Sequence, residues 1–310
     1  MQVLGKLGGA GKQALTEISS LEDTIRLGGS IVSALGQLLF STPDTQNPFK
    51  GAVSIPKRAA WSPALPLELI KLIGRTYGST VNDVLLSAVT GALRQYMQIQ
   101  TDGSKPADLH SFVPVDLRRE SRRASAQFLL GGPYQEELGN QFGFAVLPLP
   151  LSIQDPVERL EVIHRTMDVL KASGEALVSN WVLSLMGVMP GEIQNLAARF
   201  WMTKGSAVMT NVAGPRHQLY LGGAAIDTLI GWVPQSADIG LGVSIFSNNG
   251  KVWLGIATDQ GLVPDPERIV EYFLDDFRLL LEQSRRKTFV AGELPLLPDQ
   301  TTQPGTQTVE

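Results

Sequence analysis

Two apolar runs late in the sequence predict a pair of adjacent antiparallel strands, and they restrict the fold more than any other local pattern. The runs are Gly240–Phe246 and Lys251–Thr258, and Asn249-Gly250 lies between them. Asn-Gly favours a two-residue hairpin turn, because both central residues of that turn need positive φ. Ala207–Val212 and Ala224–Ile230 are predicted as further strands, so the last third of the chain is expected to be rich in strand.

Helical periodicity and short extended runs alternate through the rest of the chain. Strands are predicted at Arg58–Ser62, Leu109–Asp116 and Phe142–Pro150, and the prolines of the last one hold it to a sheet edge or a strand end. Helices are predicted at Leu67–Tyr77, Val81–Ile99, Asp155–Ala172, Glu175–Val188, Gly191–Met202 and Pro266–Arg285. This order predicts an α/β (α+β) layered sandwich, in which helices flank a mixed β-sheet, rather than a doubly wound fold.

Composition shifts divide the chain into four segments. Residues 1–41 carry apolar residues at helical spacing and are expected to pack on the rest of the chain, on another protein or on a membrane surface. Residues 42–56 are predicted to be a linker, because Pro, Asn and Gly are frequent there. Residues 57–290 form the predicted main domain, and the Pro-containing residues 291–310 a disordered tail.

Charge and cysteine content exclude several classes of function. The 310 residues have a formal net charge of −4 and no cysteine. A basic footprint for nucleic acid is therefore absent, and so are disulfides, thiol nucleophiles and zinc–thiolate sites. We expect no secretory signal and no membrane-spanning segment, because no early apolar run reaches about 20 residues. These features are consistent with a cytoplasmic protein.

The three histidines do not predict a catalytic base. His110 begins a predicted strand and His217 follows a Gly-Pro turn, while His164 and Asp168 are four residues apart on a predicted amphipathic helix. Residues at that spacing form ordinary surface pairs, so we interpret His164 and Asp168 as such a pair. The sequence also lacks a Gly-x-Ser-x-Gly motif, a P-loop, a metal-ligand cluster and a dinucleotide fingerprint.

The remaining polar and turn-forming candidates each have a structural explanation beside a functional one. Thr80 or Ser79 can cap the helix that follows, with Asp83 at its third position, and this role accounts for both Asn82 and Asp83. Asn211, Gly214 and Pro215 end a strand in a sharp turn. Other candidates either fix local structure or contact an apolar substrate, and these are Asn140, Trp232 and Pro234.

Several of these segments together, in order, resemble the second half of the bacterial wax ester synthase/diacylglycerol acyltransferase family, which belongs to the chloramphenicol-acetyltransferase-like superfamily. The resemblance covers roughly residues 43–280. The matching segments are Ser79–Val84, Val113–Arg118, Leu138–Gly143, Asn211–Pro215, Tyr220–Gly223, Gly231–Pro234, Trp253–Asp259 and Pro264-Asp265. The family's His-His-x-x-x-Asp-Gly motif occurs nowhere in these 310 residues.

The resemblance implies a fold, a reaction and a deficiency. The chain would be one chloramphenicol-acetyltransferase-like half, and residues 1–41 would be the helical lead-in from a missing first half. The reaction would be acyl transfer from acyl-CoA, as a substrate, to diacylglycerol or a long-chain alcohol, with no resident cofactor or metal. Its general base would be a His of the first half, so this chain would be active only with a first-half partner. The expected protein partner is a first-half acyltransferase polypeptide or, in a homo-oligomer, further copies of this chain.

The resemblance also suggests site residues and leaves alternatives open. Asn82 and Asp83 would lie near the active site, while the segments containing Asn140, Asn211, Gly214, Pro215, Trp232 and Pro234 would line a substrate tunnel between the halves. One alternative is a lipid- or protein-binding module that kept the fold without the chemistry. Another is a condensation-type acyltransferase, which the same missing motif disfavours. Peripheral contact with a membrane or lipid droplet is a further expectation of the family.

Overall fold

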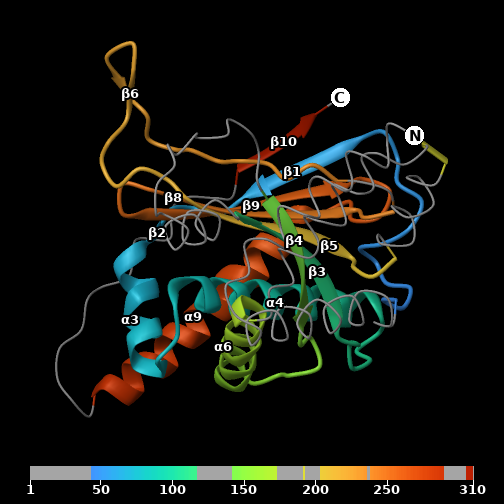
Figure 1. Ribbon diagram of the computed structural model, residues 1–310, viewed down its shortest axis with the longest axis horizontal. Coiled ribbons are helices and arrows are strands. Elements are labelled where there is room, and N and C mark those ends of the chain that lie inside the picture. The colour runs from blue at the N-terminus through green and yellow to red at the C-terminus, as the bar shows by residue number, and fades with distance from the viewer. Residues whose placement is uncertain are drawn as a thin grey trace, which may run out of the picture.

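One mixed sheet forms the centre of the protein (Figure 1). The computed structural model describes residues 43–116, 142–172, 191–192, 203–235, 238–289 and 305–309. The strand order is β10-β1-β9-β8-β5-β3-β4, and β2 pairs with β9 at one end of it. Strand β5 is parallel to β3 and β8, while the other pairings are antiparallel. The predicted mixed sheet is therefore confirmed. The strands of this sheet are β1 (Lys57–Trp61), β2 (Leu65–Pro66), β3 (Leu109–Asp116), β4 (Phe142–Leu149), β5 (Ala207–Ala213), β8 (Leu241–Asn248), β9 (Lys251–Asp259) and β10 (Gly305–Val309).

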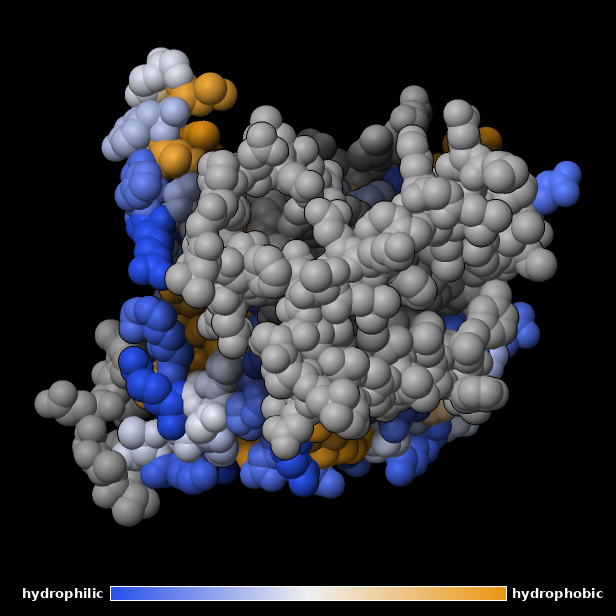
Figure 2. Space-filling view, in the orientation of Figure 1, coloured by the Kyte–Doolittle hydropathy of each residue, from blue (hydrophilic) through white to orange (hydrophobic). Residues whose placement is uncertain are grey.

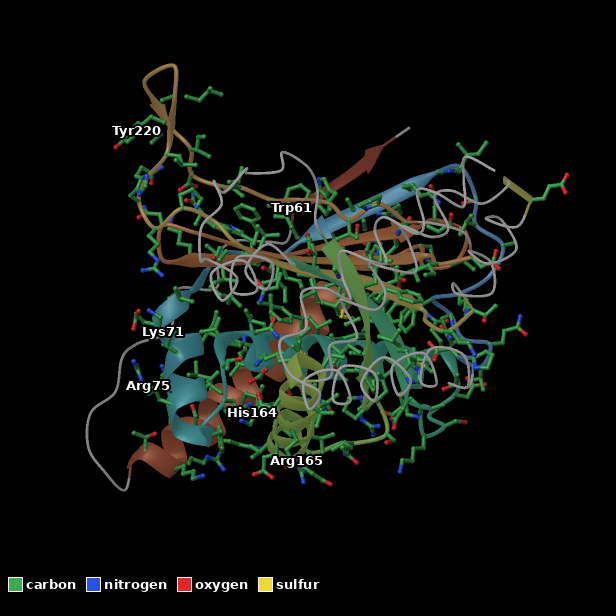
Figure 3. The ribbon with its side chains drawn as sticks, in the orientation of Figure 1. Trp61, Lys71, Arg75, His164, Arg165 and Tyr220 are labelled. Atoms are coloured by element: carbon green, nitrogen blue, oxygen red, sulfur yellow. The ribbon has the colours of Figure 1, made fainter. Side chains whose placement is uncertain are left out.

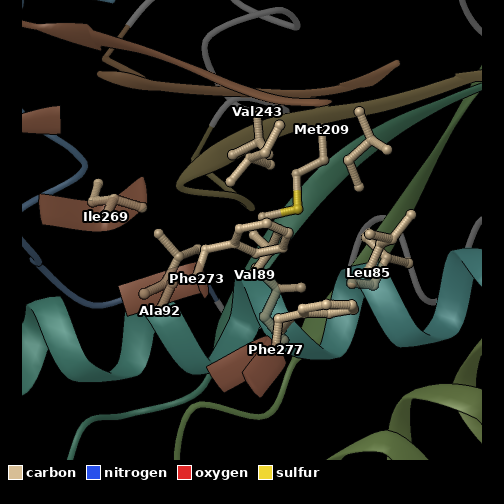
Figure 4. Packing of buried hydrophobic residues seen from close by; sticks show 14 of the residues in the cluster. Leu85, Val89, Ala92, Met209, Val243, Ile269, Phe273 and Phe277 are labelled. Carbon is tan, nitrogen blue, oxygen red and sulfur yellow. The ribbon is translucent and has the colours of Figure 1, made fainter. Parts of the chain in front are cut away.

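Among the described residues, four helices cover one face of this sheet (Figure 1). They are α3 (Leu67–Tyr77), α4 (Val81–Gln100), α6 (Pro156–Ala172) and α9 (Pro266–Phe289). Helix α4 is buried along most of its length, and its side chains pack against α9 and the central strands (Figure 4). The core between them is continuous, and its fully buried members include Val89, Val243 and Phe273.

Local sequence signals explain where these elements begin and end. Helix α3 ends at Gly78, which has a φ of 67° and so adopts a conformation that other residues disfavour. Helix α6 begins after Asp155, whose Oδ1 accepts from the backbone N–H groups of Val157 and Glu158 at 2.9 and 2.8 Å. The predicted hairpin between β8 and β9 is also confirmed, since Asn249 and Gly250 both have positive φ, 47° and 74°.

The opposite face of the sheet carries a smaller apolar cluster and a projecting hairpin. Phe112, Val208, Val233 and Ile239 form the buried part of that cluster. The hairpin consists of β6 (Tyr220–Leu221) and β7 (Ala224–Ala225), all four residues of which are exposed. It stands away from the body at the upper left of Figure 1, and Figure 2 shows apolar surface near its tip.

The predicted strand Ala224–Ile230 is wrong beyond Ala225. Residues 226–235 have no strand partner, and side chains bind their backbone instead. Gln218 Nε2 donates to the carbonyl of Ile226 at 2.6 Å, and Ser244 Oγ donates to the carbonyl of Gly231. The apolar residues in this run suggested a strand, but beyond Ala225 the observed backbone hydrogen bonds are to side chains and, from Ile226 N–H, to the carbonyl of Leu219.

Two expectations about the segments flanking the main domain also change. Residues 43–56 are irregular, but they are fixed to the core: Phe49 is fully buried, and Asp44 accepts from Ser206 Oγ at 2.6 Å. In the tail, residues 305–309 pair with β1 as β10. Thr and Val are frequent in this segment and favour a strand. The predicted helices at 175–188 and 191–202 lie almost wholly outside the described residues.

Candidate functional site

The start of helix α4 is held by a reciprocal capping box. Thr80 Oγ1 accepts from the backbone N–H of Asp83 at 3.2 Å, and Asp83 Oδ2 accepts from the backbone N–H of Thr80 at 2.9 Å. This arrangement confirms the predicted cap and satisfies two of the N–H groups that a helix start leaves without partners. The first turn of α4 is therefore fixed by its own sequence.

Asn82 has a different role from the one predicted for it, because it takes no part in the cap. Its Oδ1 accepts from Asn211 Nδ2 at 2.8 Å, and the two residues are 129 positions apart in the sequence. Asn211 is an exposed residue of β5, near the end from which the chain leaves the sheet. The helix start and the strand end thus bring two predicted site residues together as a pair of side-chain amides.

Asp83 is also the partner of a histidine that the sequence interpretation underrated. His164 Nδ1 lies 2.8 Å from Asp83 Oδ2, whereas His164 Nε2 lies 3.5 Å from Asp168 Oδ2. The Asp83 side chain is 0% exposed, the His164 side chain 30% and the Asp168 side chain 58%. The pair with Asp168 exists, but interpreting His164 as an ordinary surface residue was wrong, because its closer partner is buried.

A signal for this contact was present in the sequence. Leu160, Ile163 and Met167 form the predicted and observed buried face of α6. His164 follows Leu160 by four residues and precedes Met167 by three, so it belongs beside that face rather than opposite it. The identity of its partner on α4 follows only from the packing of the two helices.

Gly214 and Pro215 form a tight junction where β5 ends. Gly214 N–H donates to the carbonyl of Ser247 at 2.8 Å, and the carbonyl of Pro215 accepts from Asn249 N–H at 3.0 Å. A Cβ atom at Gly214 would overlap the Ser247 carbonyl oxygen and press on the ring of Phe246. The strand-terminating turn is thus real, and it depends on glycine for space rather than for a positive φ.

Trp232 and Pro234 lie on the sheet face that the helices leave uncovered. Trp232 is 47% exposed, and its ring meets Trp61 edge-on with 6.3 Å between centroids. Figure 3 shows Trp61 on this face of the sheet. The intervening Val233 is buried, so Trp232 and Pro234 are presented outward on either side of it.

The candidates therefore form two groups on either side of β5. Asn82, Asp83 and Asn211 gather with His164 on the helix side, while Gly214, Pro215, Trp232 and Pro234 lie on or near the other side. The Phe246 ring lies between the two parts of the second group. A Cβ atom added at Gly214, or at Gly231 next to Trp232, would lie within 4.0 Å of this ring. Asn140 lies outside the described residues.

A buried ion pair supports α4 behind this site. Arg159 of α6 pairs with Asp276 of α9, and its Nε donates to the carbonyl of Ser87 in α4 at 3.1 Å. Burial raises the pKa of Asp276, and the Arg159 guanidinium only partly offsets that rise. The pair joins three helices below the site and lies away from the exposed amides, so we assign it a structural role.

The site offers polar recognition but no complete set of catalytic groups within the described residues. Asn82 and Asn211 can donate and accept hydrogen bonds. His164 has an imidazole, but its Nδ1 is engaged by Asp83 and its Nε2 faces the Asp168 carboxylate. Acyl transfer to a hydroxyl also needs a base placed against that hydroxyl, and none of these groups is set up for it.

Comparison with known proteins gives one consistent family. Residues 138–281 match the model of the WS/DGAT C-terminal domain. A Mycobacterium tuberculosis protein named as a diacylglycerol O-acyltransferase is 27% identical over 252 residues, which cover 79% of this chain and 47% of the relative. The O-acyltransferase WSD of Acinetobacter baylyi is 24% identical over 279 residues, covering 84% of this chain and 57% of that protein.

A solved structure extends the likeness to the fold. The wax ester synthase/diacylglycerol acyltransferase from Marinobacter aquaeolei VT8 has a TM-score of 0.54 and 21% identity, covering 84% of this chain and 56% of that one. The chain spans about half the length of these curated and structural relatives. The layered fold predicted from the sequence is thus shared with an acyltransferase of known structure.

Proposed function

We propose that this chain, which belongs through its C-terminal domain to the wax ester synthase/diacylglycerol acyltransferase family of O-acyltransferases, forms the second half of an acyl-transfer site. The contact between Asn82 and Asn211 carries the proposal, because it joins two family-like motifs that are 129 residues apart. The general base is a His of a His-His-x-x-x-Asp-Gly segment, which these 310 residues lack. The base therefore comes from chain outside this sequence or from a partner polypeptide.

The proposed substrates follow the names of the relatives. Acyl-CoA donates the acyl group, and diacylglycerol or a long-chain alcohol accepts it, as the names of the M. tuberculosis and Marinobacter proteins suggest. The amides of Asn82 and Asn211 bind polar atoms at the reacting centre, where a fixed hydrogen-bond donor lowers the cost of developing charge. Trp232 and Pro234 contact the acyl chain on the apolar side. No resident cofactor is required.

Contact with a lipid surface is part of the proposal, because the acceptors are lipids. Among the described residues, none of the helices is both long and apolar enough to span a membrane. Access to diacylglycerol then requires peripheral binding at a membrane or a lipid droplet. Flotation of the protein with phosphatidylcholine vesicles, with and without dioleoylglycerol, tests this part, and equal recovery at the bottom of both gradients contradicts it.

The activity is tested by reconstitution. We would measure transfer of labelled palmitoyl from its CoA thioester to dioleoylglycerol and to hexadecanol, using the chain alone and mixed with a first-half polypeptide that carries the His motif. Transfer only in the mixture is the expected result. Transfer by the chain alone would refute the argument about the missing base, and no transfer from folded samples would favour a binding module.

Variants connect the activity to the site. Asn211→Ala removes the amide that donates to Asn82, and Gln154→Ala removes an exposed amide in the segment just before α6. We expect Asn211→Ala to lower transfer in the mixture by about 10- to 1000-fold, as for other donors at reacting centres, and Gln154→Ala to leave it unchanged. Equal activity of the two variants would place the reacting centre elsewhere.

A further inference from the structure

His164 makes a contact near the site that the proposed function does not use. It lies on α6 below the sheet (Figure 3), and its partner Asp83 lies on α4, 81 residues earlier in the sequence. Asp83 is 0% exposed, and within the described part of the chain its Oδ1 has no hydrogen-bond partner. Among the described residues, the hydrogen bonds of this buried carboxyl group are therefore all made by Oδ2.

An ionised carboxylate can only accept hydrogen bonds. With Asp83 ionised, its Oδ2 accepts from the backbone N–H of Thr80 at 2.9 Å and from Nδ1 of His164 at 2.8 Å, so Nδ1 carries the proton. Within the described residues, the imidazole is thus one of two groups that hydrogen-bond to the Asp83 carboxylate, the other being the backbone N–H of Thr80.

Loss of the His164 donor would disturb the first turn of α4. A buried carboxylate deprived of a partner bears most of its desolvation cost, and it turns or draws in water to recover hydrogen bonds. Asp83 is the third residue of the first turn of α4 and forms half of its capping box. Asn82 precedes it in the same turn, so any movement of Asp83 shifts the amide that meets Asn211.

We propose that His164 is a positioning residue, which holds the Asn82–Asn211 pair in register by donating from Nδ1 to Asp83. The proposal extends the proposed function, because it assigns a purpose to fixing that pair. The contact with Asp168 is not part of it: that distance is 3.5 Å, and Asp168 is 58% exposed and also 3.5 Å from Lys171. Exposed pairs of this kind contribute little.

Three substitutions separate the two sides of the imidazole. His164→Asn keeps an N–H donor close to the position of Nδ1, His164→Leu keeps bulk but no donor, and Asp168→Asn leaves the Asp83 contact intact. For each variant we would record the side-chain amide signals of Asn82 and Asn211 by ¹⁵N NMR. We would also measure kcat and KM for palmitoyl transfer in the reconstituted mixture, together with the unfolding midpoint.

The expected results are specific to positioning. The wild-type spectrum shows a proton on His164 Nδ1, and His164→Leu moves the Asn211 amide signal and lowers kcat between about 10- and 100-fold with little change in KM. His164→Asn restores most of both, and Asp168→Asn behaves as wild type. An unprotonated Nδ1, equal effects of Leu and Asn, or a loss in Asp168→Asn as large as that in His164→Leu overturns the proposal.

Failure of the proposal is distinguishable from failure of the proposed function. If the wild-type mixture transfers no palmitoyl, the acyltransferase assignment fails, while the NMR signals of Asn82 and Asn211 still report on positioning. If His164→Leu does not fold, two observations still test the positioning role: whether Nδ1 carries a proton in the wild type, and whether His164→Asn keeps the amide signals and the activity. If the side-chain amide signals of Asn82 and Asn211 do not move in a folded His164→Leu protein, the positioning role is wrong, whatever the activity.

Discussion

Replacing Gly91 with alanine should unfold this protein more easily, although alanine is the better helix former. Gly91 lies inside α4, where the Arg159–Asp276 ion pair passes across the helix. A Cβ atom at this position would overlap the Asp276 carboxylate and lie 2.5 Å from Arg159 Nη2. The ion pair leaves space for a hydrogen atom and for nothing larger.

The expected magnitude follows from two opposing effects. Alanine in place of glycine in a helix interior stabilises by about 1 kcal/mol. Separating a buried ion pair costs about 3–5 kcal/mol, because each charge is left without its partner in a poorly solvated place. Arg159 is 1% exposed and cannot move out to water. We therefore expect Gly91→Ala to lower the free energy of unfolding by about 2–4 kcal/mol.

Urea denaturation followed by circular dichroism measures the change, and a double-mutant cycle assigns it. Gly91→Ala would be placed in the wild type and in an Arg159→Met/Asp276→Ala background, which removes both charges and the Asp276 side-chain atoms that the new Cβ would overlap. Replacing a buried pair with apolar side chains is often neutral, so that background should fold. We expect the alanine to cost far less there. An equal cost in both backgrounds, or no cost in the wild type, would refute the reasoning.

Three further predictions concern the cap, an acidic group and a crowded glycine. Thr80→Ala should cost about 0.5–2 kcal/mol of stability, while Asn82→Ala, which is no cap, should cost less than about 0.5; thermal unfolding distinguishes them. Burial raises the pKa of Asp259, but hydrogen bonds from Lys57, Ser54 and Gly261 outweigh it and bring the pKa below its usual value. The ionised Asp259 therefore stabilises the fold fully above its unfolded pKa of about 3.9, and this stabilisation is lost as the pH falls through the lower folded pKa. The difference in the free energy of unfolding between wild type and Asp259→Asn should narrow as the pH falls below about 4. Gly214→Ala should cost about 1–3 kcal/mol by overlap with the Ser247 carbonyl, whereas Gly231→Ala, whose Cβ would be 4.0 Å from Phe246, should be near neutral; equal urea midpoints would contradict this.

The sequence predicted elements best where a local signal marks their ends. Helix α3 was predicted with the observed bounds, because Gly78 ends it, and the β8–β9 hairpin followed from Asn249-Gly250. The strand predicted for Ala224–Ile230 failed, because its apolar residues do not reveal that Gln218 and Ser244 bind the backbone nearby. Hydrogen bonds from side chains to the backbone do not change the spacing of apolar residues, so the sequence pattern does not reveal them.

In the candidate site, too, local contacts could be predicted and contacts between distant residues could not. The cap formed by Thr80 and Asp83 is local and could be predicted, whereas the contacts of Asn82 with Asn211 and of Asp83 with His164 span 129 and 81 residues. Resemblance to a family made Asn82 and Asn211 separate site candidates, but it did not predict that they touch. The second needed the packing angle between α4 and α6, which no spacing rule supplies.

The position of β1 in the sheet has a consequence for biosynthesis. Its partner on one side is β9, with Lys57 opposite Asp259, so a strand made early pairs with one made some 200 residues later. Helix α4 likewise packs on α9, near the end of the described main domain. The first strand and the central helix therefore leave the ribosome long before their partners exist, and at about 5–20 residues per second they wait for roughly 10–40 seconds. During that interval their apolar faces are available to chaperones, and the core closes only after β9 and α9 have been made.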